Sequence, residues 1–310
     1  MRGGVESVSV ESKKRLKKSV PFYFMLIIPM VFYVVFRYLP LAGNIIAFRR
    51  FRMGGSIYGT GEFTLRYFEM FLSDPTFYAA LRNTLILNAW TLAFAFPLPI
   101  IFVLLLNEVQ KSGFKRLVQT VSYLPRFVST VVVVSIVMMI GSPSNGIINT
   151  ILVDVFNGEA IFFANDAAWF RPLYVSTELW QFMGWNSIIY FASLSAIDPT
   201  LYEASMIDGA NRFERVIHVT LQGIKPTIII NFIISVGYLM TLSFDKIFLL
   251  WTPQNSTSAD VLDMLVFRMG LQLNNFSYAA AIGLFSSLVA LILVASSNYI
   301  ARKLSDTSLF

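Results

Sequence analysis

Residues 200–226 read TLYEASMIDGANRFERVIHVTLQGIKP and lie between two strongly apolar segments. Acidic, basic and histidine side chains follow one another closely in this stretch, and such groups are costly inside hydrocarbon. The stretch must therefore lie at a membrane surface or inside protein. We interpret it as the polar connector around which the apolar segments of the chain are arranged.

The connector has a helical pattern that is interrupted once. Its apolar residues recur about every 3.6 residues, as in an amphipathic helix; they are Leu201, Ala204, Ile207 and Ala210. Residues 208–211, DGAN, supply a break because Gly and Asn tolerate left-handed backbone. A second short helix fits residues 212–222. The pattern predicts two helices joined by a turn, lying flat on the cytoplasmic face of a membrane, where a partner protein can bind them.

The composition is that of a membrane protein. Of the 310 residues, 56% are hydrophobic and 14% are charged, and the chain has no Cys. Several windows of about 20 residues lack charges, which is the length that a bilayer core requires. The alternating pattern of an outer-membrane barrel is absent, so helices are the expected spanning form. The net charge of +6 does not indicate nucleic-acid binding, because the basic residues are dispersed around the apolar segments.

The sequence predicts an all-α polytopic membrane protein with six transmembrane helices in one domain. The expected spans are residues 20–38, 77–106, 116–140, 172–197, 227–251 and 278–300. Pro97 and Pro99 should kink the second span. Short helices are expected outside the spans at residues 63–72 and 260–271.

Basic residues set the expected orientation. They cluster before the first span and recur in residues 110–116, 212–225 and 302–303, which places both termini in the cytoplasm. Four arginines in the first external loop would favour the opposite orientation, but the basic residues on the cytoplasmic side outweigh them. The four are Arg49, Arg50, Arg52 and Arg66. The expected division is a cytoplasmic tail at 1–19, a permease domain at 20–303 and a second tail at 304–310.

The connector resembles the EAA loop of binding-protein-dependent ABC importer permeases. Glu203-Ala204-Ser205 is followed by Gly209 and then by Val219-Thr220-Leu221, at the spacing of that family. Gln222 stands where the family has Pro, which leaves the end of the second helix undefined. The resemblance implies that this coupling loop contacts an ATPase through Glu203, Ala204, Ser205, Asp208, Gly209 and Arg212. A simple helix-capping charge is the alternative role for Glu203.

Further segments resemble the polysaccharide branch of the same family. They include Leu106-Asn107-Glu108, Tyr123-Leu124-Pro125, Ser142-Pro143, residues 260–263 and residues 267–271. The resemblance implies the type I ABC importer permease fold in a bacterial cytoplasmic (inner) membrane. It also implies an oligosaccharide substrate, a second homologous permease, two ATP-binding subunits that hold ATP and Mg, and an extracytoplasmic solute-binding protein.

No catalytic or cofactor site is visible in the sequence. The absence of Cys excludes thiol chemistry, and a single histidine leaves no histidine cluster. That histidine, His218, lies in the polar connector, so we interpret it as a surface residue rather than as part of a Ser-His-Asp triad. Residues 141–146 have the glycine spacing of a phosphate loop, but Ile147 replaces the required Lys. We therefore expect no enzyme activity, metal or cofactor in this chain.

Polar residues inside the expected spans are candidates for a substrate path, because such residues are costly in a membrane. Glu178, Gln181 and Trp185 share one face of the fourth span. The other candidates are Asn83, Asn88, Asn231 and Ser235. Hydrogen bonds between helices, worth about 1 kcal/mol each, are the alternative role. Arg82 and Arg126 are expected to extend toward the ends of their spans, and Asp245 with Lys246 is expected to form a local pair.

Two questions stay open from the sequence. The external arginines favour acidic sugars such as uronate-containing fragments, with contact to the solute-binding protein or to lipid headgroups as the alternative. A secondary transporter of a small polar solute is the other candidate function, with Glu178 as its coupling carboxylate. A membrane enzyme would require a catalytic constellation that the sequence does not show.

Overall fold

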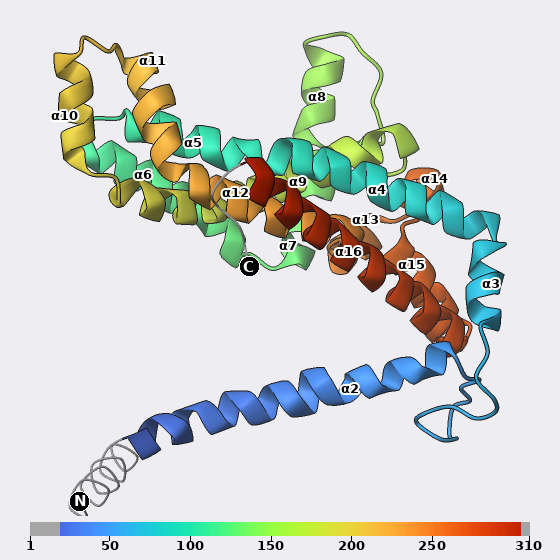
Figure 1. Ribbon diagram of the computed structural model, residues 1–310. Coiled ribbons are helices and arrows are strands. Elements are labelled where there is room, and N and C mark those ends of the chain that lie inside the picture. The colour runs from blue at the N-terminus through green and yellow to red at the C-terminus, as the bar shows by residue number, and fades with distance from the viewer. Residues whose placement is uncertain (1–18, 305–310) are drawn as a thin grey trace, which may run out of the picture.

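The computed structural model describes residues 19–304, and helices make up most of them (Figure 1). The expected tails, apart from Ser19 and Leu304, lie outside the described residues. Within the described part of the chain no β-strand forms, and the pairing of Arg50 with Thr60 is an isolated bridge. The predicted all-α architecture is confirmed.

Four described helices are long and apolar enough to cross a membrane, and a bent pair of helices brings the number to five. The four are Ser19–Ala47, Pro75–Asn107, Arg212–Met240 and Phe276–Lys303. The remaining expected span, residues 172–197, is helix α9 (Ala167–Ser195). At about 1.5 Å per residue α9 is also long enough, but polar side chains interrupt its apolar sequence.

The first span stands apart from the other helices (Figure 1). It includes η1 (Val34–Tyr38), α2 (Leu39–Leu41) and η2 (Ala42–Ala47). Every residue from 20 to 42 is exposed, and the span meets the rest of the chain where η2 packs against α16 (Phe276–Leu304). A helix that is apolar all round suits lipid or another protein rather than water.

The second span consists of two consecutive helical segments. Asp74 caps α4 (Pro75–Ala95) by accepting the Thr76 backbone N–H, and Pro75 takes the first helical position, where a missing N–H costs nothing. Pro97 begins α5 (Pro97–Asn107). The short helix expected just before this span is α3 (Arg66–Leu72).

The continuous third span that was expected at residues 116–140 is wrong. The chain forms α6 (Ser112–Tyr123), η3 (Leu124–Phe127) and α7 (Thr130–Ile140), with a bend of 104°. Pro125 cannot donate a helical hydrogen bond, Val128 is extended, and Ser129 caps α7 by accepting the Val132 N–H. Proline and a serine cap together end one helix and start the next.

The connector at 200–226 also differs from its prediction in one respect. Helix α10 (Pro199–Ile207) and the turn are present, but the second helix is not a separate short one. It runs through α11 (Arg212–Arg215), η4 (Val216–Thr220), α12 (Leu221–Gly237) and η5 (Tyr238–Met240) as one rod. The helix continues through Gln222 and, four residues later, through Pro226.

The fifth span is broken as well. The expected helix over residues 227–251 stops at η5, residues 241–243 are non-helical, and α13 (Phe244–Leu250) follows. Beyond it lie α14 (Ser256–Ala259), α15 (Leu262–Phe267) and η6 (Arg268–Gln272), which fill the region where a short helix was expected at 260–271. Non-helical backbone at membrane depth is tolerated where it is buried or lines a cavity.

Helix α9 is the centre of the packing. It contacts α4, α5, α6 and α12, and its buried side chains contribute to two apolar clusters. One cluster joins α9 to α4, α13 and α15 through residues such as Phe170, Tyr174 and Ile247. The other joins α9 to α5 and α12 through Tyr190 and Ile224. Polar residues on α9 therefore lie among helices that pack against it.

Candidate functional site

A cavity of about 820 Å³ lies beside the middle of α9, between α4, η3, α12 and η5. This volume is within the range of sites for small ligands, about 300–1,000 Å³. Of the seven path residues predicted from sequence, five line it, which are Asn88, Glu178, Trp185, Asn231 and Ser235. Sequence reasoning missed other lining side chains, including Arg126, Tyr174, Phe182, Asn186 and Tyr238.

The cavity face of α9 differs from the predicted stripe at one of its three positions. Glu178, Phe182 and Trp185 line the cavity, at the i, i+4 and i+7 spacing of one helix face. Gln181 is buried and points to η3 instead, where its amide donates to the Val128 carbonyl across 3.1 Å. Gln181 thus joins two helices at the bend of the third span.

The carboxylate of Glu178 is held by a lysine. Lys246 Nζ on α13 lies 2.6 Å from Glu178 Oε1, and the side chains are 1% and 15% exposed, respectively. The expected local pair of Asp245 with Lys246 is wrong, because residues i and i+1 of a helix point in different directions. Glu178 therefore enters the cavity wall as half of a neutral ion pair.

Arg126 was expected to extend toward the end of its span and instead lies at the cavity wall. Its Cζ is 5.0 Å from the ring centroid of Phe182 and 5.7 Å from that of Trp185. Phe127 meets the Trp185 ring edge-on, at 5.8 Å between centroids. The break at η3 thus brings a cation and three aromatic rings together beside a cavity.

The predicted path residues Asn88, Asn231 and Ser235 also donate hydrogen bonds to backbone carbonyls. Asn88 donates to the Leu239 carbonyl across 2.8 Å, which joins α4 to η5. Asn231 donates to the Thr227 carbonyl, and Ser235 donates to the Asn231 carbonyl, within α12. Each amide oxygen stays available as an acceptor.

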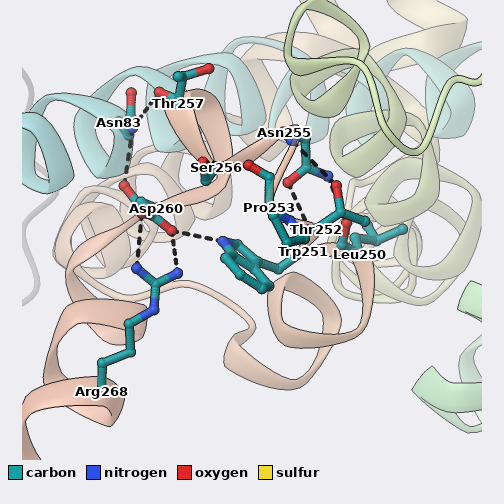
Figure 2. Close-up of polar contacts among 10 residues, drawn as sticks. All are labelled: Asn83, Leu250, Trp251, Thr252, Pro253, Asn255, Ser256, Thr257, Asp260 and Arg268. Carbon is teal, nitrogen blue, oxygen red and sulfur yellow. Dashed lines mark hydrogen bonds and ion pairs between the residues drawn. The ribbon is translucent and has the colours of Figure 1, made fainter.

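Asn83 lies outside the cavity, in a network drawn in Figure 2. Its amide donates to the carbonyls of Thr257 and Asp260, across 2.9 and 3.0 Å. The Asp260 carboxylate accepts two bonds from Arg268 and one from the Trp251 indole N–H (Figure 2). This network fastens the chain between α13 and α15 to α4, so Asn83 holds the fold together beside the cavity.

The turn after α10 has the geometry that the sequence predicts. Gly209 has φ = +81°, and the Ala210 N–H donates to the Ser205 carbonyl while the Gly209 N–H donates to Met206. This is the Schellman arrangement, in which a left-handed residue ends the helix. A capping box was missed: Asn211 and Glu214 exchange side-chain and backbone hydrogen bonds, a signal readable as Asn-x-x-Glu.

The coupling residues named from sequence are close together and mostly exposed. Glu203, Ala204, Asp208, Gly209 and Arg212 are exposed, and Ser205 is half-buried. Two large apolar side chains beside them are also exposed, Ile207 at 87% and Phe213 at 72%. At the start of α10, hydrogen bonds from the backbone and side chain of Thr200 lower the pKa of Asp198, which keeps this cap ionised.

Within residues 19–304 no three His, Asp or Glu side chains are grouped as metal ligands. The features of the site are a polar, aromatic-lined cavity between apolar helices and an exposed helical turn. Together with the membrane-spanning helices they define the class of a multi-pass membrane permease.

Comparison with known proteins gives the family. Residues 95–306 match the family described as binding-protein-dependent transport system inner membrane component, and the chain belongs to this family. The resemblance inferred from the connector is confirmed. As a member, the chain is a permease subunit of an ABC importer and is not itself the enzyme of that system.

Three similar proteins cover nearly the whole chain. Protein LplB of Bacillus subtilis (strain 168) is 40% identical over 95% of this chain and 92% of its own length. The polygalacturonan/rhamnogalacturonan transport system permease protein YteP of the same strain is 37% identical over 99% and 97%. The third is a chain in the crystal structure of a bacterial alginate ABC transporter in complex with an alginate pentasaccharide-bound periplasmic protein. It superposes with a TM-score of 0.87 at 33% identity, and the match covers 96% of this chain and 99% of that chain.

Proposed function

We propose that this chain is the permease subunit of an ATP-driven importer of oligosaccharides, with uronate-containing sugars as its substrate class. The observation that carries the proposal is the arrangement of the cavity and the turn on one helical rod. Residues 212–240 form a continuous helix that begins at the exposed turn and lines the cavity through Asn231 and Ser235. Movement of the turn is carried along this rod to the cavity wall.

The cavity suits a sugar. Sugars bind through hydrogen bonds to polar groups and through contact of their apolar faces with aromatic rings, and the cavity offers amides, hydroxyls and aromatic rings such as Trp185. Two similar proteins support the acidic class, because one is named for polygalacturonan and rhamnogalacturonan and the other for alginate. We extend that substrate class to this chain.

The turn suits an ATPase. Exposed Ile207 and Phe213 would be unfavourable in water and fit a hydrophobic pocket of a partner. Glu203 and Arg212 beside them add charges of both signs for pairing at the rim. In this proposal the turn and both chain termini lie in the cytoplasm, a second permease completes the path, and a solute-binding protein delivers the sugar from outside.

The alternative function, a secondary transporter driven through Glu178, receives less support. A coupling carboxylate must exchange a proton or ion with the path. Glu178 is engaged by Lys246 at 2.6 Å, so its charge is already compensated within the chain.

Two exposed phenylalanines provide a matched test. Phe213 beside the turn and Phe156 after α8 (Ile147–Asp154) are each 72% exposed, and neither substitution with serine should unfold the chain. Phe213→Ser is expected to reduce co-purification of the ATPase subunits and ATP-driven uptake of oligosaccharide, while Phe156→Ser retains the ATPase. Equal retention of the ATPase by both variants would count against the turn as the docking site, and absence of sugar uptake by the wild-type complex would overturn the function.

A further inference from the structure

Arg126 is a charged residue in the cavity wall, and no ion pair within residues 19–304 accounts for its charge. It lies in η3, at the break between α6 and α7, and its guanidinium is next to Phe182 and Trp185 close to the midpoint of α9. A cation at the middle of a membrane helix bundle is costly and is retained where it serves the path. Arg126 is exposed, and it lines the cavity.

The charge of Arg126 is not compensated by the described part of the chain. Glu178 is the carboxylate in the cavity lining, and Lys246 engages it. No ion pair or hydrogen bond joins the guanidinium of Arg126 to a described residue. The pair of Glu178 and Lys246 sums to zero, so Arg126 leaves the cavity wall with one net positive charge.

The aromatic rings leave the hydrogen-bonding edge of Arg126 available. The Cζ of Arg126 lies 5.0 Å from the ring centroid of Phe182 and 5.7 Å from that of Trp185, and such cation–π contacts leave N–H groups of the guanidinium free to donate hydrogen bonds. The N–H groups of a guanidinium lie in its plane and point away from its faces. This edge matches a carboxylate, which accepts two parallel hydrogen bonds from it.

We infer that Arg126 is a specificity-determining residue that binds the carboxylate of a uronate sugar as the sugar passes through the cavity beside Trp185. This inference rests on the proposed function and adds the residue that distinguishes an acidic sugar from a neutral one. Trp185, 42% exposed, provides the surface for the apolar face of the same sugar, so one unit contacts both side chains. Free lipid phosphate is not the ligand proposed, and the test separates it from a sugar.

The test uses the whole importer complex in nanodiscs, without the solute-binding protein. Equilibrium binding is measured for labelled trigalacturonate and for its methyl ester, which has the same length and no charge. The wild-type complex is expected to bind the acid about 10-fold or more tightly than the ester, because a hydrogen-bonded charge pair is lost with the ester. Arg126→Gln is expected to abolish this preference, and Arg126→Lys to keep part of it, since lysine cannot form the two parallel bonds.

Arg82→Gln is the matched control. Arg82 is an exposed arginine of α4 that does not line the cavity, so this variant removes the same charge and should keep the preference. Adding vesicles rich in anionic lipid should leave the difference in affinity between the two sugars unchanged. If the added lipid abolishes this difference, Arg126 binds lipid phosphate and the inference is overturned.

Three results would overturn the role of Arg126. They are equal or undetectable binding of the two sugars by the wild type, an unchanged preference in Arg126→Gln, and a loss in that variant that is the same for both sugars. ATP-driven uptake of trigalacturonate into proteoliposomes tests the proposed function separately. If the Arg126→Gln complex takes up trigalacturonate as well as the wild type, the role of Arg126 is refuted and the proposed function stands. If the wild type shows no uptake, the proposed function is refuted as well.

Discussion

Lys246 on α13 and Glu178 on α9 form an ion pair across 2.6 Å, although 68 residues separate them in sequence. The pair joins the short helix after the break in the fifth span to the central helix of the fold. Because Lys246 is 1% exposed, its charge has no water to compensate it if Glu178 is removed. The pair therefore holds the cavity wall and α13 in register.

Breaking this pair from one side should destabilise the protein more than removing it altogether. Lys246→Met or Glu178→Gln alone leaves a buried charge, which costs about 3–5 kcal/mol in proteins where it has been measured. The double variant carries no such charge and should recover much of the loss. Thermal unfolding of the purified complex, followed by tryptophan fluorescence, measures both. Additive losses in the double variant would show that the two side chains act independently.

Gly209 should tolerate no side chain even though space is available. A Cβ there meets no atom within 4 Å, but φ is +81°, and left-handed backbone costs an L-residue about 1–2 kcal/mol. Gly209→Val should therefore distort the turn and reduce ATP-driven uptake. Gly113→Ala is the control, because Gly113 also has open space and no positive φ. If Gly209→Val complexes assemble and transport at the wild-type rate, the role of the turn is refuted.

Gly184 is expected to be intolerant for a different reason. A Cβ at Gly184 would lie 2.2 Å from the backbone oxygen of Ser122, where α6 crosses α9. Gly184→Ala should separate these helices at a cost of about 1–3 kcal/mol, and the unfolding temperature should fall. Gly283→Ala in α16 meets nothing within 4 Å and should leave stability unchanged or raise it, since alanine favours helix. A fall of the same size in both variants would contradict the close contact.

Asp74 should make stability depend on acid pH. Partial burial raises its pKa, but hydrogen bonds from Thr76 and from the Tyr278 hydroxyl lower it by more, so the net pKa is below the ordinary value. A lowered folded-state pKa stabilises the protein above the unfolded-state pKa, and this contribution is lost as pH falls through the folded-state value. The unfolding temperature should therefore fall less between pH 6 and pH 3 in Asp74→Asn than in the wild type. Identical pH profiles would remove this role.

The local features of the chain could be predicted from its sequence. The turn at Gly209 follows from residues that favour left-handed backbone, and the apolar stripe of α10 follows from helical periodicity. The start of α4 follows from Asp74 and Pro75 in the same way. Each of these depends on neighbours within a few residues, which a sequence displays directly.

The features that depend on distant contacts could not be predicted. Gln181 and Phe182 are adjacent, and whether one or the other faces the cavity depends on how α9 rotates against η3. The pairing of Lys246 with Glu178 required the break after η5, and the sequence of residues 241–243, TLS, has no Pro or Gly to indicate it. Arg126 was expected near the end of its span because residues 116–140 were predicted as one helix, without the bend that Pro125 introduces.

The isolation of the first span has a consequence for how the protein is made. No residue between 20 and 42 is covered by a later part of the chain, and a helix satisfies its own backbone hydrogen bonds in lipid. This segment can therefore insert into the bilayer during synthesis before the following helices exist. The broken spans cannot do the same, because the non-helical backbone beside α7 and α13 has unpaired polar groups. These groups are shielded from lipid only after the neighbouring helices have packed against them.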